Sequence, residues 1–238
     1  MDSAFKKVTD GIYRLDIPFD YLYTSVFLIF GENPIIVDSA TTREDVSERI
    51  LPALDSLGIT PTHLLVTHRH GDHNGGTPFL LAARSNITPV TLCDGESLGS
   101  VTGILLGGHT EDSMGYYETR TGTLLCGDAL QFYGVGKYGC SIVNAAMYEE
   151  TLNRLDALGA NAILPSHDFV GGSAAAIGEA NVRALLSSAR EIWEEIKAFV
   201  LSHPSDLDPF EVVRAWKEAN PTLPPLPSIT VKSVRENA

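Results

Sequence analysis

The sequence predicts an α/β fold in which two β-sheets pack together and helices cover their outer faces. The first observation is that a block of strands followed by a helix occurs twice in succession along the chain. The second is the composition: the chain has 238 residues, of which 44% are hydrophobic and 20% charged, as is usual for a globular protein with a substantial core. Because each sheet must bury its apolar face, two blocks of this kind favour stacked layers.

The first block begins with residues 11–17, where apolar and polar side chains alternate as they do in a half-buried strand. Residues 24–40 predict a hairpin, because G-E-N-P separates two apolar runs. Residues 41–58 predict a helix with a threonine cap and an acidic first turn, and Pro52 should kink it or shorten its first half. The block closes with a strand over residues 62–68 and a helical pattern over residues 75–85.

The second block contains four strands, a helix and a last short strand, expected over residues 87–92, 101–110, 114–119, 123–130, 145–158 and 162–167. Past Gly172 the pattern becomes helical, and residues 174–201 predict one long amphipathic helix. Its apolar stripe consists of Val182, Leu185, Leu186, Ala189, Ile192, Trp193 and Ile196. A shorter helix over residues 209–219 precedes a proline-rich stretch and a polar tail. We therefore expect a main domain over residues 1–172 and a helical extension over residues 173–238 packed on it.

The net charge indicates which partners to expect, and the cysteines indicate the cellular compartment. The formal net charge is -13, and no basic run alternates with aromatic residues, so a nucleic-acid partner is not expected. The three cysteines form no C-x-x-C pair, which favours free thiols in a reducing compartment. The first residues lack the apolar segment of a secretion signal, and every apolar run is too short to span a membrane. We expect a cytoplasmic protein without a membrane partner, either a monomer or a homodimer.

The segment H-R-H-G-D-H places four residues of metal-ligand type within six positions: His68, His70, Asp72 and His73. In extended backbone His68 and His70 point to the same side, and a turn at Gly71 can fold the other two toward the same space. Imidazole nitrogens and carboxylate oxygens are the ligands that zinc, iron or manganese take. Because four ligands this close fit one tetrahedral ion poorly, some of them are expected to face a second metal.

Three further residues of ligand type stand where predicted strands end. His109 follows an apolar strand in G-G-H-T, Asp128 ends a strand in L-L-C-G-D-A-L, and His167 ends another in I-L-P-S-H-D. Catalytic groups usually collect in such connections at the edge of a rigid scaffold. His63 and His203 belong to no such pattern and are expected to be ordinary structural residues.

The series H-R-H-G-D-H, G-H-T, G-D-A-L and P-S-H resembles the ligand series of the metallo-β-lactamase-fold hydrolases. The resemblance implies a four-layer αββα sandwich, with residues 1–172 as the catalytic domain, and two metal ions, zinc or else iron or manganese. It implies this assignment of ligands: His68, His70 and His109 for the first metal, Asp72, His73 and His167 for the second, and Asp128 as the bridge. Asp38, in I-I-V-D-S, matches a family position that supports the ligands from behind.

The segment after Asp128, G-D-A-L-Q-F-Y-G-V-G-K-Y-G, is similar to the glyoxalase II pattern in which G-D-T-L-F leads to G-C-G-K/R. Lys137 stands at the same offset as the basic residue that, in glyoxalase II, helps to hold the glutathione part of a thioester. A solvated surface lysine is the alternative, and Gly139 replaces a tyrosine of that pattern. A related lactonase branch has a tyrosine where this chain has Gln131, and Tyr133 is a further candidate for substrate binding.

The resemblance implies a dinuclear metal-dependent hydrolase acting on a small-molecule thioester, lactone or similar ester. A water bridging two cations would lose a proton near neutral pH, and the resulting hydroxide would attack the carbonyl carbon. Asp72 would orient this hydroxide and could carry its proton. One alternative is an oxidoreductase similar to the persulfide dioxygenases, which have nearly the same ligand series but bind a single iron. A phosphodiesterase or a β-lactamase fits the residues less well.

Overall fold

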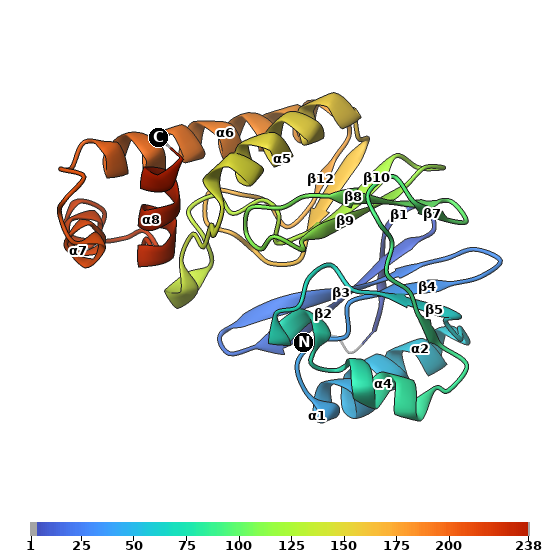
Figure 1. The fold of residues 1–238 in the computed structure, drawn as a ribbon. Helices are drawn as coiled ribbons and strands as arrows, with labels where there is room; N and C mark the ends of the chain where they lie inside the picture. The colour runs from blue at the N-terminus through green and yellow to red at the C-terminus, as the bar shows by residue number, and fades with distance from the viewer. Residues whose placement is uncertain (1–3, 238) are drawn as a thin grey trace. The chain divides into compact units, whose positions relative to one another are not determined.

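The structure is a computed structural model that describes residues 4–237 as two mixed sheets flanked by helices (Figure 1). The first sheet has six strands in chain order: β1 (Lys6–Thr9), β2 (Ile12–Phe19), β3 (Leu22–Ile29), β4 (Ile35–Val37), β5 (His63–Leu65) and β6 (Thr88–Pro89). The second has the order β12 (Ala176–Ile177), β11 (Ala162–Pro165), β10 (Thr123–Gly127), β9 (Met114–Glu118), β8 (Val101–Leu105) and β7 (Ser97–Leu98). The predicted class, α/β with two sheets and outer helices, is confirmed.

The chain divides into two compact units. The first unit contains the described residues up to Ile104 together with Met114–Leu125, and the second contains Leu105–Ser113 and the described residues from Cys126 onward. The predicted division at residue 172 stays a prediction.

In the first unit the hairpin of β2 and β3 is the longest ladder, with antiparallel pairs from Ile12 and Ile29 to Phe19 and Leu22. Strands β4 and β5 run parallel, and Ile36 pairs with Leu64. In Figure 1 the helices α2 and α4 lie along one face of this sheet. The core on that face consists of Phe5, Leu15, Ile17, Val26, Leu28, Ile36, Ala40, Val46, Ile50, Ala53, Leu54, Leu64, Leu80 and Ile87.

The helix predicted over residues 41–58 forms in three continuous parts: α1 (Arg43–Asp45), the π-helical turn η1 (Val46–Ile50) and α2 (Leu51–Leu57). Thr42 caps it, because its hydroxyl accepts from the backbone N–H of Asp45 (3.0 Å) while the Asp45 carboxylate accepts from that of Thr42 (3.0 Å). The predicted disturbance at Pro52 takes the form of the wide turn η1 just before it. Since proline has no N–H to give to the preceding turn, a wider turn there keeps the helix continuous.

Two predicted strands are shorter than expected. Of residues 87–92 only Thr88–Pro89 forms a strand, at the edge of the first sheet, where the N–H groups of Thr88 and Val90 donate to β5 and the residue before it. The strand expected over residues 101–110 ends at Leu105. Gly108 follows with a φ of +129°, a backbone conformation that favours glycine, so His109 lies in a loop.

The second unit is built on four helices: α5 (Ala145–Leu158), α6 (Glu179–Leu201), α7 (Pro209–Ala219) and α8 (Ser228–Glu236). Helices α5 and α6 lie side by side (Figure 1), and the Trp193 ring packs edge-on against that of Tyr148 with centroids 5.1 Å apart. All seven residues of the predicted apolar stripe of α6 are buried. The amphipathic pattern therefore identified the buried face of this helix correctly.

Two predictions for the C-terminal part are wrong. The long helix begins at Glu179 and not at residue 174, because Ala176–Ile177 pairs with β11 and Gly178 has a φ of +88°. The expected polar tail contains the helix α8. Its buried face is half hydroxyl-bearing, consisting of Thr230, Val231, Ser233 and Val234, so no apolar stripe marks it in the sequence.

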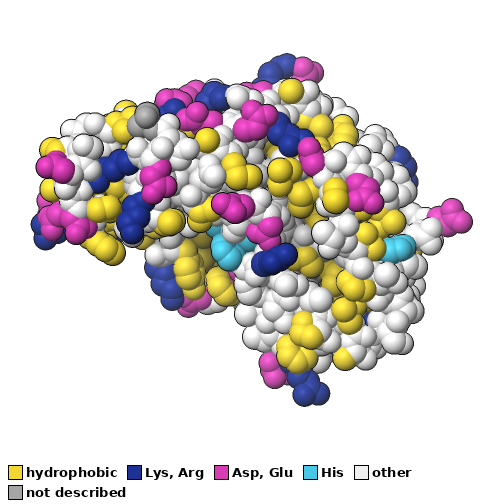
Figure 2. All heavy atoms as spheres, in the orientation of Figure 1, with side chains coloured by type: hydrophobic (Ala, Val, Ile, Leu, Met, Phe, Trp, Pro, Cys, Tyr) yellow, Lys and Arg dark blue, Asp and Glu magenta, His cyan; other side chains and the backbone are white. Residues whose placement is uncertain are grey.

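Charged side chains are spread over the visible surface, where acidic groups lie among basic and apolar ones (Figure 2). Within residues 4–237, no helix combines the length and the apolar character needed to cross a bilayer.

A buried carboxylate holds the turn between β9 and β10. Glu118 accepts hydrogen bonds from the backbone N–H (2.9 Å) and hydroxyl (2.7 Å) of Thr121 and from Nε of Arg120 (2.7 Å). Burial alone would raise the pKa of Glu118, but hydrogen bonds from Thr121, Arg120 and Ser100 lower it to about 2.

We expect Glu118→Gln to lower the free energy of unfolding at pH 7 by no more than about 3 kcal/mol. Because the folded-state pKa lies below the unfolded value of 4.5, the charged carboxylate stabilises the fold above about pH 4.5. This contribution is lost as the pH falls toward 2. Urea unfolding of both proteins at pH 7 and pH 3 measures the difference, and an equal difference at the two pH values would contradict the assignment.

Candidate metal centre

The segment that carries His68, His70, Asp72 and His73, called here the first ligand group, follows the parallel strand β5 in the first unit. Its central turn is the one-turn helix α3 (Gly71–Asn74). His68 and His73 are buried, Asp72 is half-buried and His70 is exposed. The group thus runs from the interior to the surface, as an accessible centre requires.

The two glycines after this segment let the chain pack tightly against the end of β4. Gly76 donates its N–H to the carbonyl of Ala40 (2.9 Å), and Ser39 donates to that of His73 (2.8 Å). A Cβ on Gly76 would lie 1.9 Å from the carbonyl oxygen of Ser39, and one on Gly75 would lie 2.2 Å from that of Thr41. Only glycine permits this approach, which fixes the position of the His73 turn.

Asp38 lies behind the first ligand group and is fully buried. Its carboxylate accepts hydrogen bonds from the backbone N–H (2.7 Å) and hydroxyl (2.9 Å) of Thr67 and from Nδ1 of His73 (2.8 Å). A hydrogen on Nδ1 leaves Nε2 of His73 as the nitrogen that could bind a metal, as in carboxylate–histidine–metal arrangements. The resemblance implies a supporting role for Asp38, and that role stays a prediction.

The ligand atoms of the first group are spaced as ligands of a common ion would be. Nε2 of His68 lies 3.0 Å from Nδ1 of His70, and Nε2 of His73 lies 3.3 Å from Oδ2 of Asp72. Two ligands of a tetrahedral zinc ion, each about 2.0–2.1 Å from it, are about 3.3 Å apart. The hydroxyl of Thr24 donates to Oδ2 of Asp72 (3.0 Å) and orients that carboxylate.

A second ligand group, consisting of His109, Asp128 and His167, lies in the second unit. These residues follow β8, β10 and β11, and all three are buried. Oδ2 of Asp128 lies 3.3 Å from Nε2 of His167 and 3.7 Å from Nε2 of His109. The two imidazoles therefore present the same nitrogen to one carboxylate oxygen.

The carbonyl of Ser141 fixes the orientation of His109. Nδ1 of His109 lies 2.8 Å from this oxygen, and since a carbonyl only accepts, Nδ1 is the donor. Nε2 is then the nitrogen left to bind a metal, as it is in His73. Ser141 could not be identified from the sequence, because the role of a backbone carbonyl does not depend on the residue type.

The donor set fits a divalent metal, since it consists of imidazole nitrogens and carboxylate oxygens with the Nδ1 atoms of two histidines already held by the protein. Groups of histidine and aspartate side chains that could hold an ion are present among the described residues. Every member of these groups is one of the seven predicted ligands. Their assignment to individual ions stays a prediction.

The two candidate substrate residues lie in the loop that follows Asp128. Lys137 is exposed in the short helix η2 (Gly136–Tyr138), with its ammonium 5.3 Å from the centre of the Tyr138 ring. The hydroxyl of Tyr133 donates to Glu195 on α6 (2.6 Å), and burial together with this hydrogen bond raises the pKa of Tyr133 to about 12. Substrate binding by either residue stays a prediction.

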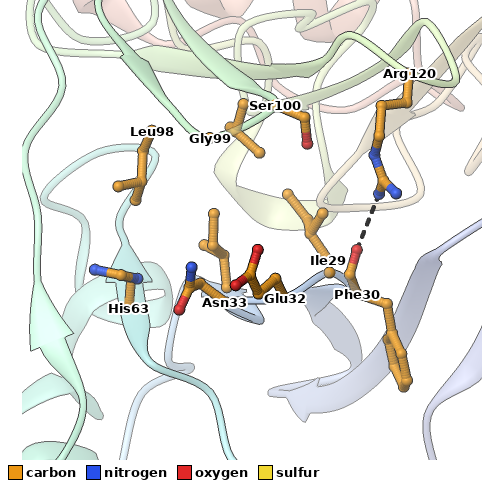
Figure 3. A pocket seen from close by; sticks show the side chains of 12 residues that line it. Ile29, Phe30, Glu32, Asn33, His63, Leu98, Gly99, Ser100 and Arg120 are labelled. Carbon is orange, nitrogen blue, oxygen red and sulfur yellow. Dashed lines mark hydrogen bonds between the residues drawn. The ribbon is translucent and has the colours of Figure 1, made fainter.

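A pocket of about 260 Å³ in the first unit lies away from these ligands (Figure 3). Ile35 and His63, which begin β4 and β5, are part of its lining, whereas the first ligand group follows the other end of β5. Figure 3 shows Glu32 and Asn33 beside His63. The hydroxyl of Thr62 lies 2.8 Å from Nδ1 of His63, which agrees with the structural role expected for this histidine.

Comparisons with known proteins agree with this geometry. The family model described as the metallo-beta-lactamase superfamily matches residues 20–90, which contain Asp38 and the first ligand group. A crystal structure of a metallo beta lactamase from Erythrobacter litoralis superposes with a TM-score of 0.62 at 22% identity, covering 79% of this chain and 96% of that one. The predicted metallo-β-lactamase sandwich fold is thereby confirmed.

Curated relatives add hydrolases to the comparison. An uncharacterised protein of Bacillus subtilis is 30% identical over 45% of this chain and 62% of its own length. An atrochrysone carboxyl ACP thioesterase of Aspergillus aculeatus is 23% identical over 59% and 48%. A hydroxyacylglutathione hydrolase of Methylococcus capsulatus is 33% identical over 54% and 57%. The chain thus matches about half to three-fifths of the length of these relatives.

We expect Asp38→Asn to weaken zinc binding about 10- to 100-fold while the fold is kept. Asparagine has the same shape and tolerates the positive φ of this position (64°), but it lacks the charge that holds Nδ1–H of His73. Competition with a coloured chelator measures the affinity. Asp10→Asn, at an exposed carboxylate paired with Lys7, is the matched control and should bind zinc as the wild type does. Equal affinity of Asp38→Asn and the control would refute the role of Asp38.

We expect Gly76→Ala to lower the free energy of unfolding by about 1–3 kcal/mol or more, because the new methyl group would collide with the carbonyl of Ser39. Gly31→Ala is the control: its Cβ would meet no atom within 4 Å, and the change should stay within about 0.5 kcal/mol. Urea denaturation measures both. Equal stability of the two variants would show that the stability of the fold does not depend on the close approach of residues 75–76 to the end of β4.

Proposed function

We infer that the chain, which carries a metallo-β-lactamase superfamily domain on the metallo-β-lactamase fold, is a hydrolase that uses two bound zinc ions to cleave a thioester or a related ester. The observation that carries this proposal is the pair of histidines whose Nδ1 atoms are held by the protein. Asp38 holds His73 and the carbonyl of Ser141 holds His109, so in both residues Nε2 is presented as a ligand. A purely structural pair of histidines would not need this common orientation.

We assign the ligands as the resemblance implies: His68, His70 and His109 to one ion, Asp72, His73 and His167 to the other, and Asp128 to both. The spacings within each ligand group support this assignment. Nitrogen and oxygen donors of this kind suit zinc, and they also suit iron or manganese.

Bound divalent ions would supply a water of lowered pKa and would polarise the carbonyl of the ester. The side chains of the protein would supply the group that accepts the proton of this water and the contacts that orient it. Asp72 is half-buried, and its Oδ2 accepts a hydrogen bond from Thr24, which aims the carboxylate. We propose that Asp72 orients the attacking water and takes its proton.

A thioester is the favoured substrate class. The relatives include an ACP thioesterase and a hydroxyacylglutathione hydrolase. Lys137 offers an exposed cation in the loop after Asp128, where it would attract the carboxylates or phosphate of an acidic thiol leaving group. The hydroxyl of Tyr133 is bonded to Glu195, so we propose that only its ring contributes to substrate binding.

The cellular compartment and the oligomeric state of the enzyme are proposed from other observations. The three cysteines are all free, which fits the reducing cytoplasm, where acyl thioesters are formed. The substrate is a small molecule, and the active species is a monomer or a homodimer.

We expect the zinc-loaded protein to hydrolyse acyl-glutathione or acyl-pantetheine thioesters in a panel that also holds lactones, a cephalosporin and a phosphodiester. Asp72→Asn should lower kcat about 10²- to 10⁴-fold. Lys137→Ala should raise KM for acidic thioesters with little change in kcat, whereas Lys217→Ala, at an exposed lysine of α7, should change neither. Turnover of the phosphodiester or the cephalosporin alone would overturn the thioester assignment. Oxygen uptake with persulfides would instead establish the oxidoreductase.

A further inference from the structure

We propose that the C-terminal helix α8 positions the ligands His109 and Asp128 through a buried set of hydrogen bonds, named here the clamp (Gln131, Ser141, Thr230 and Ser233). The clamp lies entirely within the second unit. The inference deepens the proposed function and rests on it, because it concerns how tightly the second ligand group holds a metal. Its members are positioning residues, since none of them is itself a proposed ligand.

The inner part of the clamp is the side-chain amide of Gln131. Its Nε2 donates to the backbone carbonyl of Asp128 (2.8 Å), and its Oε1 accepts from the backbone N–H of Ser141 (3.0 Å). The carbonyl of Ser141 in turn accepts from Nδ1 of His109 (2.8 Å). One buried side chain therefore ties the backbone of Asp128 to the residue that orients His109.

An amide suits this connection. One end of the side chain must donate to a carbonyl and the other must accept from an N–H, and glutamine carries both functions in one planar group at every pH. A glutamate of the same length would place an oxygen against the carbonyl of Asp128, where it could only repel. The contacts at the buried position of Gln131 therefore favour an amide side chain over a carboxylate.

The outer part of the clamp comes from α8. The hydroxyl of Thr230 donates to the carbonyl of Cys140 (2.7 Å) and accepts from the N–H of Ile142 (2.9 Å). Ser233, one turn further along α8, accepts from the N–H of Ala145 (2.7 Å). The peptides on both sides of Ser141 are therefore held by one residue, Thr230, which lies about ninety positions away in the chain.

The segment from Cys140 to Asn144 belongs to no helix or strand, so its buried backbone groups must find partners elsewhere. Helix α8 supplies a buried hydroxyl to the carbonyl of Cys140 and to the N–H of Ile142. The N–H groups of Val143 and Asn144 donate to the carbonyl of Gly108. Without α8 the peptides on both sides of Ser141 would lose these partners, and the carbonyl of Ser141 would be held less firmly, although its N–H would still donate to Gln131. Since a metal-bound histidine depends on the acceptor at its second nitrogen, the docking of α8 sets the affinity of the second ligand group.

The coupling must act in both directions. If docked α8 strengthens metal binding, then bound metal strengthens the docking of α8. We therefore expect zinc to slow hydrogen exchange at the backbone amides of Ile142 and Ala145, which donate to the helix.

The test is Thr230→Val, which keeps the shape of the side chain and removes both of its hydrogen bonds. We expect the zinc dissociation constant to rise about 10- to 100-fold in chelator competition, and the visible spectrum of the cobalt-loaded protein to change. Thr230→Ser, which restores the hydroxyl, should recover both. Thr123→Val is the matched control, since it removes a buried hydroxyl with hydrogen bonds in the first unit, and it should change zinc affinity less than about twofold.

The outcomes separate the two proposals. If the wild type binds no metal tightly, the proposed function fails. If the wild type binds zinc and Thr230→Val binds it equally well with an unchanged cobalt spectrum, the clamp is refuted while the proposed function stands. Should Thr230→Val not fold, Gln131→Glu tests the inner part of the clamp by the same two readouts, and unchanged values would again refute it.

Discussion

The hydrogen bond from Nδ1 of His73 to the buried carboxylate of Asp38 is the constraint on which the first ligand group depends. A fully buried carboxylate is costly unless donors surround it, and here Thr67 supplies two and His73 the third. Asp38 follows β4 and Thr67 follows β5, so the parallel pairing of these two strands brings the donors and the acceptor together. The sheet therefore prepares the ligand nitrogen of His73 before any metal binds.

In the second unit a backbone carbonyl, in place of a carboxylate, accepts the hydrogen bond from Nδ1 of the histidine. Ser141 holds His109, but it lies in an irregular segment and is not fixed by a sheet. Gln131 and the hydroxyls of α8 supply the fixation that the two strands supply to Asp38. In our account, the C-terminal helix α8 therefore helps to position the ligands of the centre.

The sequence predicted those features whose cause is local. The first ligand group and Asp38 could be recognised because the residue types, their spacing and the strands before them all lie within one short stretch. The buried face of α6 followed from its periodicity in the same way. Ser141, Thr230 and Ser233 could not be found, because serine and threonine are common and their roles depend on contacts between residues far apart in the chain. Helix α8 was missed for the same reason, since its buried face carries hydroxyls that only their distant partners explain.

The central claim is that two metal ions act together in one hydrolytic centre. Elemental analysis of the protein purified without added metal tests it most directly, because it reports both the identity and the number of the ions. Our account predicts about two zinc ions per chain. One iron ion per chain, with no second metal, would contradict it.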